Sequence, residues 1–185
     1  MVSLGTSYWL CYANNVHNLD VNTHMLRLIA FLSVFVLGIP CAVAAEKPDL
    51  SAFLVRVAAE QPSVKWDAKS VAEGDFDGTH RVGFAIMGLK DKNVMVAVGR
   101  KAADGTLTTQ YLEFGISRDQ QNAICGLPAH LEVTPLVCTA YEDQERLPGC
   151  KESPGVSGLS LDDDQCDPIN MYWNHSTKQM MWWRN

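Results

Sequence analysis

The chain has 185 residues and a formal net charge of −6, from 15 Lys and Arg residues against 21 Asp and Glu residues. Because the sequence has no basic stripe and no polybasic cluster, its charge argues against nucleic acid and against anionic membrane surfaces as partners. The length suits a single domain that buries its own hydrophobic core.

A short basic start followed by an apolar run gives the N-terminal region the pattern of an export signal. Arg27 precedes the apolar run 28–39, and residues 42–45 then supply the small side chains that a signal peptidase requires. A transmembrane helix needs about 20 apolar residues, and Pro40 and Glu46 end this run earlier. These features predict a cleaved signal peptide rather than a retained membrane anchor.

The predicted signal peptide covers 25–45 and leaves a mature domain at 46–185, with no stable membrane span after processing. Since a signal peptide begins with its charged region, we expect residues 1–24 to be a spurious upstream extension. Lipid attachment at Cys41 is an alternative, although Pro40 stands where lipidation favours a small residue. The expected location is therefore periplasmic or secreted.

Residues 48–60 carry the apolar spacing of an amphipathic helix. The apolar positions fall at i, i+3, i+4, i+7 and i+8: Leu50, Phe53, Leu54, Val57 and Ala58. Pro48-Asp49 supplies a start signal, and Glu60-Gln61-Pro62 supplies a stop signal. We expect this helix to pack its apolar face on a sheet.

Three consecutive segments show the alternation of β-strands joined by short turns. Residues 81–89 are apolar or small on both faces, which predicts a central strand. Residues 94–98 and 107–116 also alternate, and Asp104-Gly105 between them is a strong hairpin signal. The three segments together predict an antiparallel meander.

The stretch GDFDGTHRVG at 74–83 raises the question of a calcium site. Calcium loops of the D-x-D-x-D-G type place oxygen ligands at positions 1, 3 and 5, here Asp75, Asp77 and Thr79. Position 6 favours glycine, and this chain has His80 there. Two interpretations follow: a turn whose aspartates accept backbone N–H groups, or a weak calcium site on Asp75, Asp77 and Thr79.

These ten residues also resemble the loop of FG-GAP repeats, the integrin-alpha type. Asp75, Asp77 and Gly78 match the family pattern. Where the family has Asp, Gly and Asp, this chain has Thr79, His80 and Gly83. The resemblance implies a calcium-binding loop and, in chains with several repeats, a β-propeller. Because this chain has a single copy of the loop, no propeller is expected.

The second half of the chain shows weaker alternation. Residues 131–134 predict a strand that Pro135 stops, and residues 148–167, rich in Gly, Ser and Asp, are expected to form a loop. Segments 169–174 and 179–184 carry β-favouring aromatic residues and predict a terminal hairpin. We therefore expect one α+β domain, mainly antiparallel β-sheet from the meander and the C-terminal hairpin, with one N-terminal amphipathic helix.

Four cysteines follow the predicted cleavage point: Cys125, Cys138, Cys150 and Cys166. An even number in an exported chain indicates disulfides, and the three pairings of four cysteines stay open. A structural zinc site is the alternative, but the spacings of 13, 12 and 16 lack the C-x-x-C pair that is usual in such sites. We expect two disulfides.

An acidic run at 161–167 is the first of two candidate binding features. Its residues Asp162 and Asp164 could hold a divalent cation, or could join Asp75 and Asp77 if the fold brings the two segments together. The alternative is a solvated acidic loop held by a disulfide.

The C-terminal tryptophans are the second candidate: Trp173, Trp182 and Trp183. Aromatic side chains on a sheet face can stack on sugar rings or on peptide chains. Neighbouring strand residues point to opposite faces, so Trp182 and Trp183 cannot share one. We expect one of them to pack inward, and the other, or Trp173, to lie exposed at the edge.

The mature sequence contains neither G-x-S-x-G nor H-E-x-x-H, and we assign no catalytic residue. The leading hypothesis is a non-enzymatic exported domain that binds a protein or an envelope polymer. The alternatives are a calcium-stabilised structural domain and a hydrolase that uses His130 with one of the acids. No cofactor is expected apart from the calcium of the first alternative. The sequon Asn174-His175-Ser176 is interpreted as a chance match.

Overall fold

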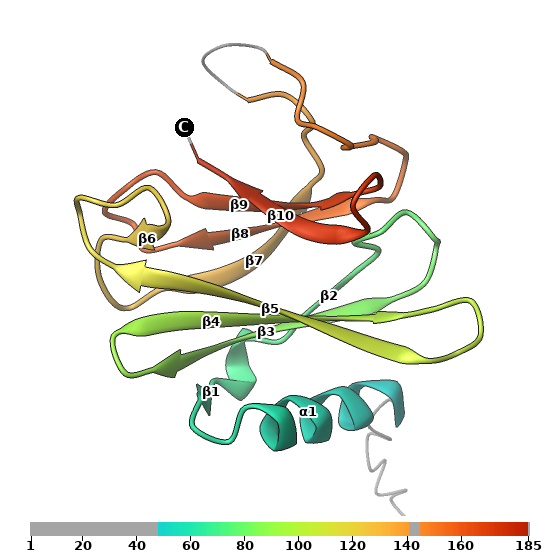
Figure 1. The fold of residues 1–185 in the computed structure, drawn as a ribbon, viewed down its shortest axis with the longest axis horizontal. Helices are drawn as coiled ribbons and strands as arrows, with labels where there is room; N and C mark the ends of the chain where they lie inside the picture. Colours follow the sequence, from blue (N-terminus) through green and yellow to red (C-terminus); the bar gives the residue numbers. More distant parts are fainter. Residues whose placement is uncertain (1–47, 141–144, 185) are drawn as a thin grey trace, which may run out of the picture. The chain divides into compact units, whose positions relative to one another are not determined.

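Two β-sheets pack face to face, and a helix covers the outer face of one of them (Figure 1). This computed structural model describes residues 48–140 and 145–184, which belong to one compact unit, Ala44–Asn185. The predicted signal peptide at 25–45 and the extension at 1–24 lie outside the described residues. The predicted α+β class with mainly antiparallel sheet is confirmed.

The first sheet has six strands in the order β1-β3-β4-β5-β6, with β2 beside β3. Their bounds are β1 Lys65–Trp66, β2 Ala72–Gly74, β3 Gly83–Lys90, β4 Asn93–Lys101, β5 Leu107–Ile116 and β6 Ala123–Ile124. The second sheet has four strands in the order β10-β9-β8-β7. Their bounds are β7 His130–Pro135, β8 Ser157–Asp162, β9 Ile169–Asn174 and β10 Gln179–Trp183. All named strand pairs are antiparallel except β5 with β6.

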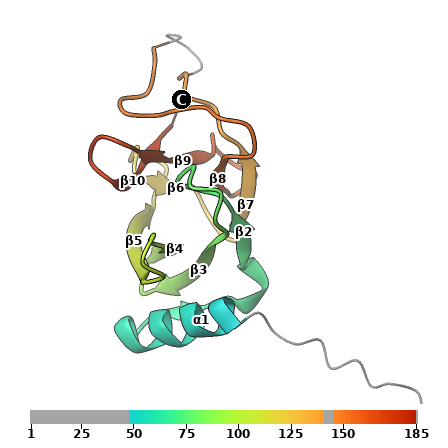
Figure 2. The same cartoon turned by 90° about the vertical axis from the view of Figure 1, so that its right-hand side faces the viewer.

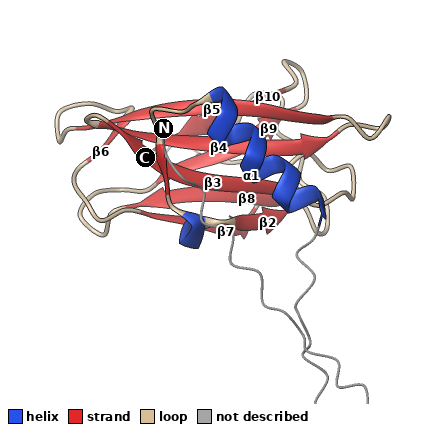
Figure 3. Cartoon of the chain, turned by 90° about the horizontal axis from the view of Figure 1, so that it is seen from below, coloured by secondary structure: helices blue, strands red, loops and turns tan. Residues whose placement is uncertain are grey.

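The helix α1, Pro48–Glu60, lies across the first sheet, as Figure 3 shows. Its buried residues Phe53 and Val57 pack on Phe84 of β3 and Ala97 of β4. A Cβ at Gly99 would come within 2.5 Å of the Phe53 ring, so a glycine on β4 lets the ring reach the sheet. The predicted helix and its packing on a sheet are confirmed, although Ala58 lies exposed beyond the contact face.

The predicted meander is formed by β3, β4 and β5, and its two apolar faces have different neighbours. Val94, Val96 and Val98 of β4 enter the core between the sheets, together with Phe114 of β5. The intervening Ala97 faces α1. Figure 2 shows β3 and β4 in the layer between α1 and the second sheet. Because both of their faces are covered, nearly every position of these strands is apolar or small.

The second sheet corrects one prediction, because part of the expected loop 148–167 is the buried strand β8. In β8, Leu159 and Leu161 point into the core between the sheets, whereas Gly158 and Ser160 alternate with them. Small residues at the alternate positions made the strand resemble a loop. The predicted terminal hairpin is confirmed as β9 and β10.

Two disulfides join the loops of the second half, as predicted. Cys125 pairs with Cys166, and Cys138 pairs with Cys150. The first is half-buried, and the second is buried against Leu147 and Tyr172. Disulfides form and persist in oxidising surroundings, so the pairs indicate an oxidising, extracellular environment. Among the described residues, no helix has the length and hydropathy of a membrane span.

Candidate functional site

The aspartates of the 74–83 stretch form a tight turn between β2 and β3. Asp75 accepts hydrogen bonds from the Thr79 N–H at 3.1 Å and from the His80 N–H at 2.8 Å. Asp77 accepts the Thr79 hydroxyl at 2.6 Å. Gly78 and His80 have positive φ angles of 71° and 59°, the left-handed conformation that such turns use. These contacts support the interpretation of the stretch as an aspartate-bonded turn.

Asp77 also connects this turn to both sheets through Arg100. The Arg100 Nη1 donates to Asp77 Oδ2 at 2.8 Å, and the guanidinium carbon lies 3.7 Å from the ring centroid of Trp173. Arg100 comes from β4 and Trp173 from β9, so the three side chains link the sheets at one end of the domain. Burial by itself raises the pKa of Asp77, but hydrogen bonds from Thr79 and Arg100 outweigh it and leave the pKa below its ordinary value.

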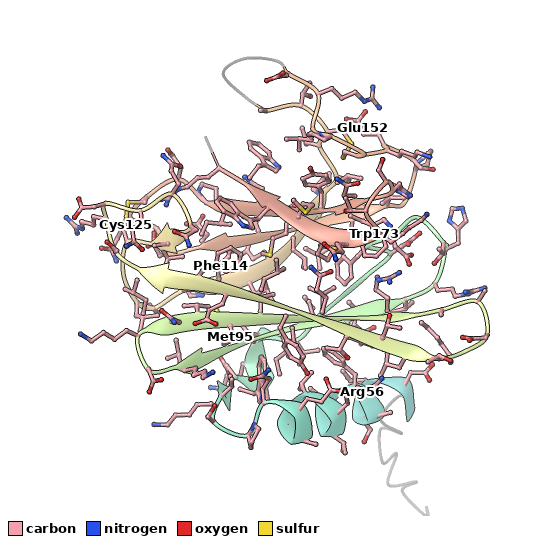
Figure 4. The ribbon with its side chains drawn as sticks, in the orientation of Figure 1. Arg56, Met95, Phe114, Cys125, Glu152 and Trp173 are labelled. Carbon is pink, nitrogen blue, oxygen red and sulfur yellow. A yellow bond between two sulfur atoms is a disulfide. The ribbon has the colours of Figure 1, made fainter. Side chains whose placement is uncertain are left out.

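The position of Trp173 corrects the expectation that its ring could lie exposed. Its side chain is 4% exposed and points between the sheets, as Figure 4 shows. The ring is enclosed by the core on one side and the Arg100 guanidinium on the other. Trp173 is therefore a packing residue and offers no face to a ligand.

The calcium site stays a prediction that these contacts do not favour. Calcium takes about 6–8 oxygen ligands, and the carboxylates of Asp75 and Asp77 already accept N–H, O–H and guanidinium donors. Within the described ranges, no group of three or more His, Cys, Asp or Glu residues is placed to hold a metal ion. A calcium ion at Asp77 would compete with the guanidinium of Arg100 for this carboxylate.

The buried, hydrogen-bonded residue of the acidic run is Asp163, rather than the predicted Asp162 or Asp164. Asp163 is 4% exposed. Its carboxylate accepts four backbone N–H groups, from Cys125, Gly126, Gln165 and Cys166. Burial raises the pKa of Asp163, but these four hydrogen bonds outweigh it and lower the pKa. Asp163 thus orders the backbone on both sides of the Cys125–Cys166 disulfide.

The structure does not bring Asp162 and Asp164 to the Asp75 turn. The carbonyl of Asp75 accepts the N–H of Ser157, the first residue of β8, at 2.8 Å, whereas the acidic run begins with the last two residues of that strand. A six-residue strand spans about 17–20 Å. Asp164 is exposed, with the Nε2 atom of His130 3.9 Å from its carboxylate.

Two of the described histidines, His130 and His175, lie at opposite ends of the second sheet. His130 is exposed beside Asp164, and no described Ser, Thr or Cys side chain hydrogen-bonds to it. His175 follows β9 at the other end of the second sheet, since Ile169 pairs with Leu161. Burial, with the nearby charges of Lys151 and Lys178, lowers the pKa of His175. The two histidines cannot act on one substrate atom.

The last two tryptophans take opposite faces, as predicted. Trp182 points inward and meets the Phe114 ring edge-on, with the ring centroids 6.2 Å apart. Trp183 points to the outer face of the second sheet, where it packs beside Tyr172 and the Cys138–Cys150 disulfide. Trp183 is therefore the predicted tryptophan on the outer face, although Trp182 is itself 36% exposed.

Trp183 lines an open groove of about 350 Å³, which we call the Trp183 groove. The chain segment 134–137 forms one wall, and Gly158, Asn170 and Tyr172 lie along its floor. A Cβ at Gly158 would come within 3.3 Å of the Thr134 hydroxyl oxygen, so glycine lets the wall lie close to the sheet. The sequence indicated Trp183 but gave no signal for the wall beyond the apolar pair Leu136-Val137.

The disulfide loop holds the wall of this groove against the sheet. Cys138 follows the wall directly and is joined to Cys150. The Tyr172 hydroxyl donates to the carbonyl of Pro148 at 3.2 Å, and the Leu147 N–H donates to the carbonyl of Cys138 at 2.8 Å. The groove is therefore built on ordered backbone next to a covalent link.

The asparagine of the predicted chance sequon, Asn174, is buried in the fold. Asn174 is 5% exposed, and its side-chain oxygen accepts the N–H groups of Ser176 and Thr177 at 2.9 Å and 3.0 Å. A glycan would be attached to the Nδ2 atom of this amide, and the burial of the side chain leaves it little room. The geometry agrees with the interpretation of the sequon as a chance match.

Comparisons of this chain with protein-family models, with curated proteins and with solved structures find no match. The resemblance to the FG-GAP loop stays a prediction based on residues 74–83. The functional argument depends on the geometry of the described residues.

Proposed function

We propose that this protein is an exported, non-enzymatic binding domain, periplasmic or secreted, and that the Trp183 groove is its binding surface. The export pattern of the leader and the Cys125–Cys166 and Cys138–Cys150 disulfides support the location. The separation of His130 from His175 and the hydrogen-bonded state of the buried carboxylates support a role without catalysis.

The observation that carries the proposal is an apolar surface beside an indole on the outer face of the second sheet. Val137 in the groove wall is 51% exposed, and Met181, two residues before Trp183 on β10, is 38% exposed. Strand residues two apart share a face, so Met181 and Trp183 lie on the same side of the sheet. Exposed apolar surface rimmed by polar groups marks binding sites.

Capture from envelope and culture extracts tests the proposal. The mature domain and its W183A and V137S variants are immobilised, and bound proteins and polymers are analysed by mass spectrometry and sugar analysis. Val55→Ser on α1 is the matched control, because Val55 is 68% exposed and lies on the other side of the first sheet. We expect the groove variants to lose a bound component that V55S retains. Equal capture by all variants would remove the groove as the binding surface.

A further inference from the structure

The outer face of the second sheet places Trp183 at the end of a cross-strand row. Trp183 is opposite Asn170, Asn170 is opposite Ser160, and Ser160 is opposite Glu132. Residues directly opposite one another in antiparallel strands share a face, so the row crosses β10, β9, β8 and β7. Three strand spacings make the row about 14 Å long.

The polar groups beside the indole have hydrogen-bonding capacity to spare. The Asn170 side chain makes a single long contact in the described part of the chain, from Nδ2 to the Pro168 carbonyl at 3.5 Å. Its side-chain oxygen accepts no described donor. The Thr134 hydroxyl also lines the groove. An amide and a hydroxyl can each donate and accept, which suits a ligand rich in hydroxyl groups.

The groove is uncharged, which restricts the ligands that it can hold. None of its described lining residues carries a charge, and the only charged member of the row is the exposed carboxylate of Glu132. An anionic group in the groove would lose water without gaining a cationic partner, and Glu132 would repel it. The net charge of −6 acts in the same direction. This charge distribution is complementary to a neutral ligand.

The size of the groove favours a narrow ligand over the surface of a folded protein. Its volume of about 350 Å³ is near the lower end of small-ligand pockets. A stable protein interface buries about 800 Å² on each partner, and the exposed apolar side chains here are few. A sugar ring presents an apolar C–H face that can stack on an indole, with hydroxyl groups at its edge.

We propose that the Trp183 groove binds an uncharged polysaccharide strand, with one sugar ring stacked on Trp183 and the hydroxyls of that ring or its neighbour bonded to Asn170 and Thr134. This inference rests on the proposed function and names the ligand class of the same site. The strand lies across the sheet from Trp183 over Asn170 and Gly158 towards Thr134, all of which line the groove.

Affinity electrophoresis and pull-down against defined polysaccharides test the inference. The panel contains neutral chains (α-glucan, β-glucan, xylan, mannan and chitin) and anionic chains (polygalacturonate and alginate). We expect binding to a neutral chain, about tenfold weaker in W183A and partly retained in W183F, because a phenyl ring still stacks. N170A should also weaken binding, whereas V55S should not. Melting curves confirm that each variant is folded.

The outcomes separate the ligand class from the proposed function. If no neutral chain binds, or if the anionic chains bind more tightly, the polysaccharide inference is overturned. The proposed function then still stands if W183A loses a component, such as a protein, captured from the extract. If a neutral chain binds equally well to W183A, the site is wrong. If nothing at all depends on Trp183, both proposals fail.

Discussion

The side-chain amide of Gln110 pairs with the backbone of Met180 as a neighbouring strand would. Its Nε2 donates to the Met180 carbonyl at 2.9 Å, and its Oε1 accepts the Met180 N–H at 2.7 Å. Gln110 belongs to β5 of the first sheet, and Met180 belongs to β10, the edge strand of the second. The contact therefore gives hydrogen-bond partners to the backbone N–H and C=O of Met180 at the edge of the second sheet, and it joins the two sheets on that side.

Replacing Gln110 by Ala should destabilise the domain by about 1–3 kcal/mol. The N–H and C=O of Met180 would lose their hydrogen-bond partners at a position that is partly buried. Urea unfolding followed by tryptophan fluorescence measures this change. Gln121→Ala is the control, since Gln121 is exposed and outside the sheets. Equal urea midpoints for the two variants would show that water replaces the Gln110 contacts without loss.

Replacing Arg100 by Ala should destabilise the domain by about 2–4 kcal/mol, because Asp77 is left as a buried unpaired carboxylate and Trp173 loses its stacked cation. Arg100→Lys should recover only part of the loss, since an ammonium lacks the planar face. Lys101→Ala is the control: its ion pair with Asp49 is exposed, and such pairs contribute about 0–1 kcal/mol. Unfolding midpoints that are equal for R100A and K101A would contradict the role of Arg100.

Stability should fall in acid because Asp77 and Asp163 have pKa values below the ordinary value of 3.8. A carboxyl whose pKa is lower in the folded state stabilises the fold above its unfolded pKa, and that stability is lost as the pH falls through the folded pKa. We expect little change from neutral pH to about pH 4 from these groups and a decline below it. Urea unfolding across this pH range measures the effect.

Asp163→Asn tests the acid dependence at a single position. The variant should be less stable at neutral pH, because asparagine has one acceptor oxygen where the carboxylate has two, so its NH2 group would face two of the four N–H donors. It should also lose less stability below pH 4. Asp167→Asn, at an exposed position, should follow the unaltered protein. If D163N shows the same acid decline, Asp163 does not contribute to it.

Calcium should shift the melting temperature by less than about one degree relative to a chelator, because a ligand stabilises only through binding to the folded state. The carboxylates of Asp75 and Asp77 are already used by Thr79, His80 and Arg100. Differential scanning fluorimetry with calcium and with chelator measures the shift. A larger shift that disappears in Asp75→Asn would establish the alternative of a calcium-stabilised domain.

The elements that the sequence predicts well are those whose pattern is local. The helix at 48–60 and the strand at 94–98 have clear apolar periodicity, and apart from Ala58 the structure keeps it. The strand at 157–162 was missed because Gly158 and Ser160 pack closely on the outer face, where small size rather than hydrophobicity matters. Pairing of the cysteines could not be predicted, since it depends on which loops the sheets bring together.

The candidate site shows the same limit. The sequence alone indicates that Trp182 and Trp183 must separate, because alternation along a strand is local. It does not indicate which of them faces the core, or that Arg100 covers Trp173, because those contacts join residues on different sheets. The acidic run can be predicted from its charge. The role of Asp163 cannot, because it depends on backbone N–H donors that only the fold brings to its carboxylate.

The wall of the Trp183 groove depends on a covalent link that the core of the domain does not use. Cys138 and Cys150 lie with Leu147 and Tyr172 in a small cluster separate from the side chains between the sheets. Production of the chain in a reducing cytosol would therefore leave the wall of the groove without its covalent anchor. A folded spectrum would not show that the groove is intact. The Cys138–Cys150 disulfide should therefore be confirmed before a failed ligand screen is taken as evidence against binding.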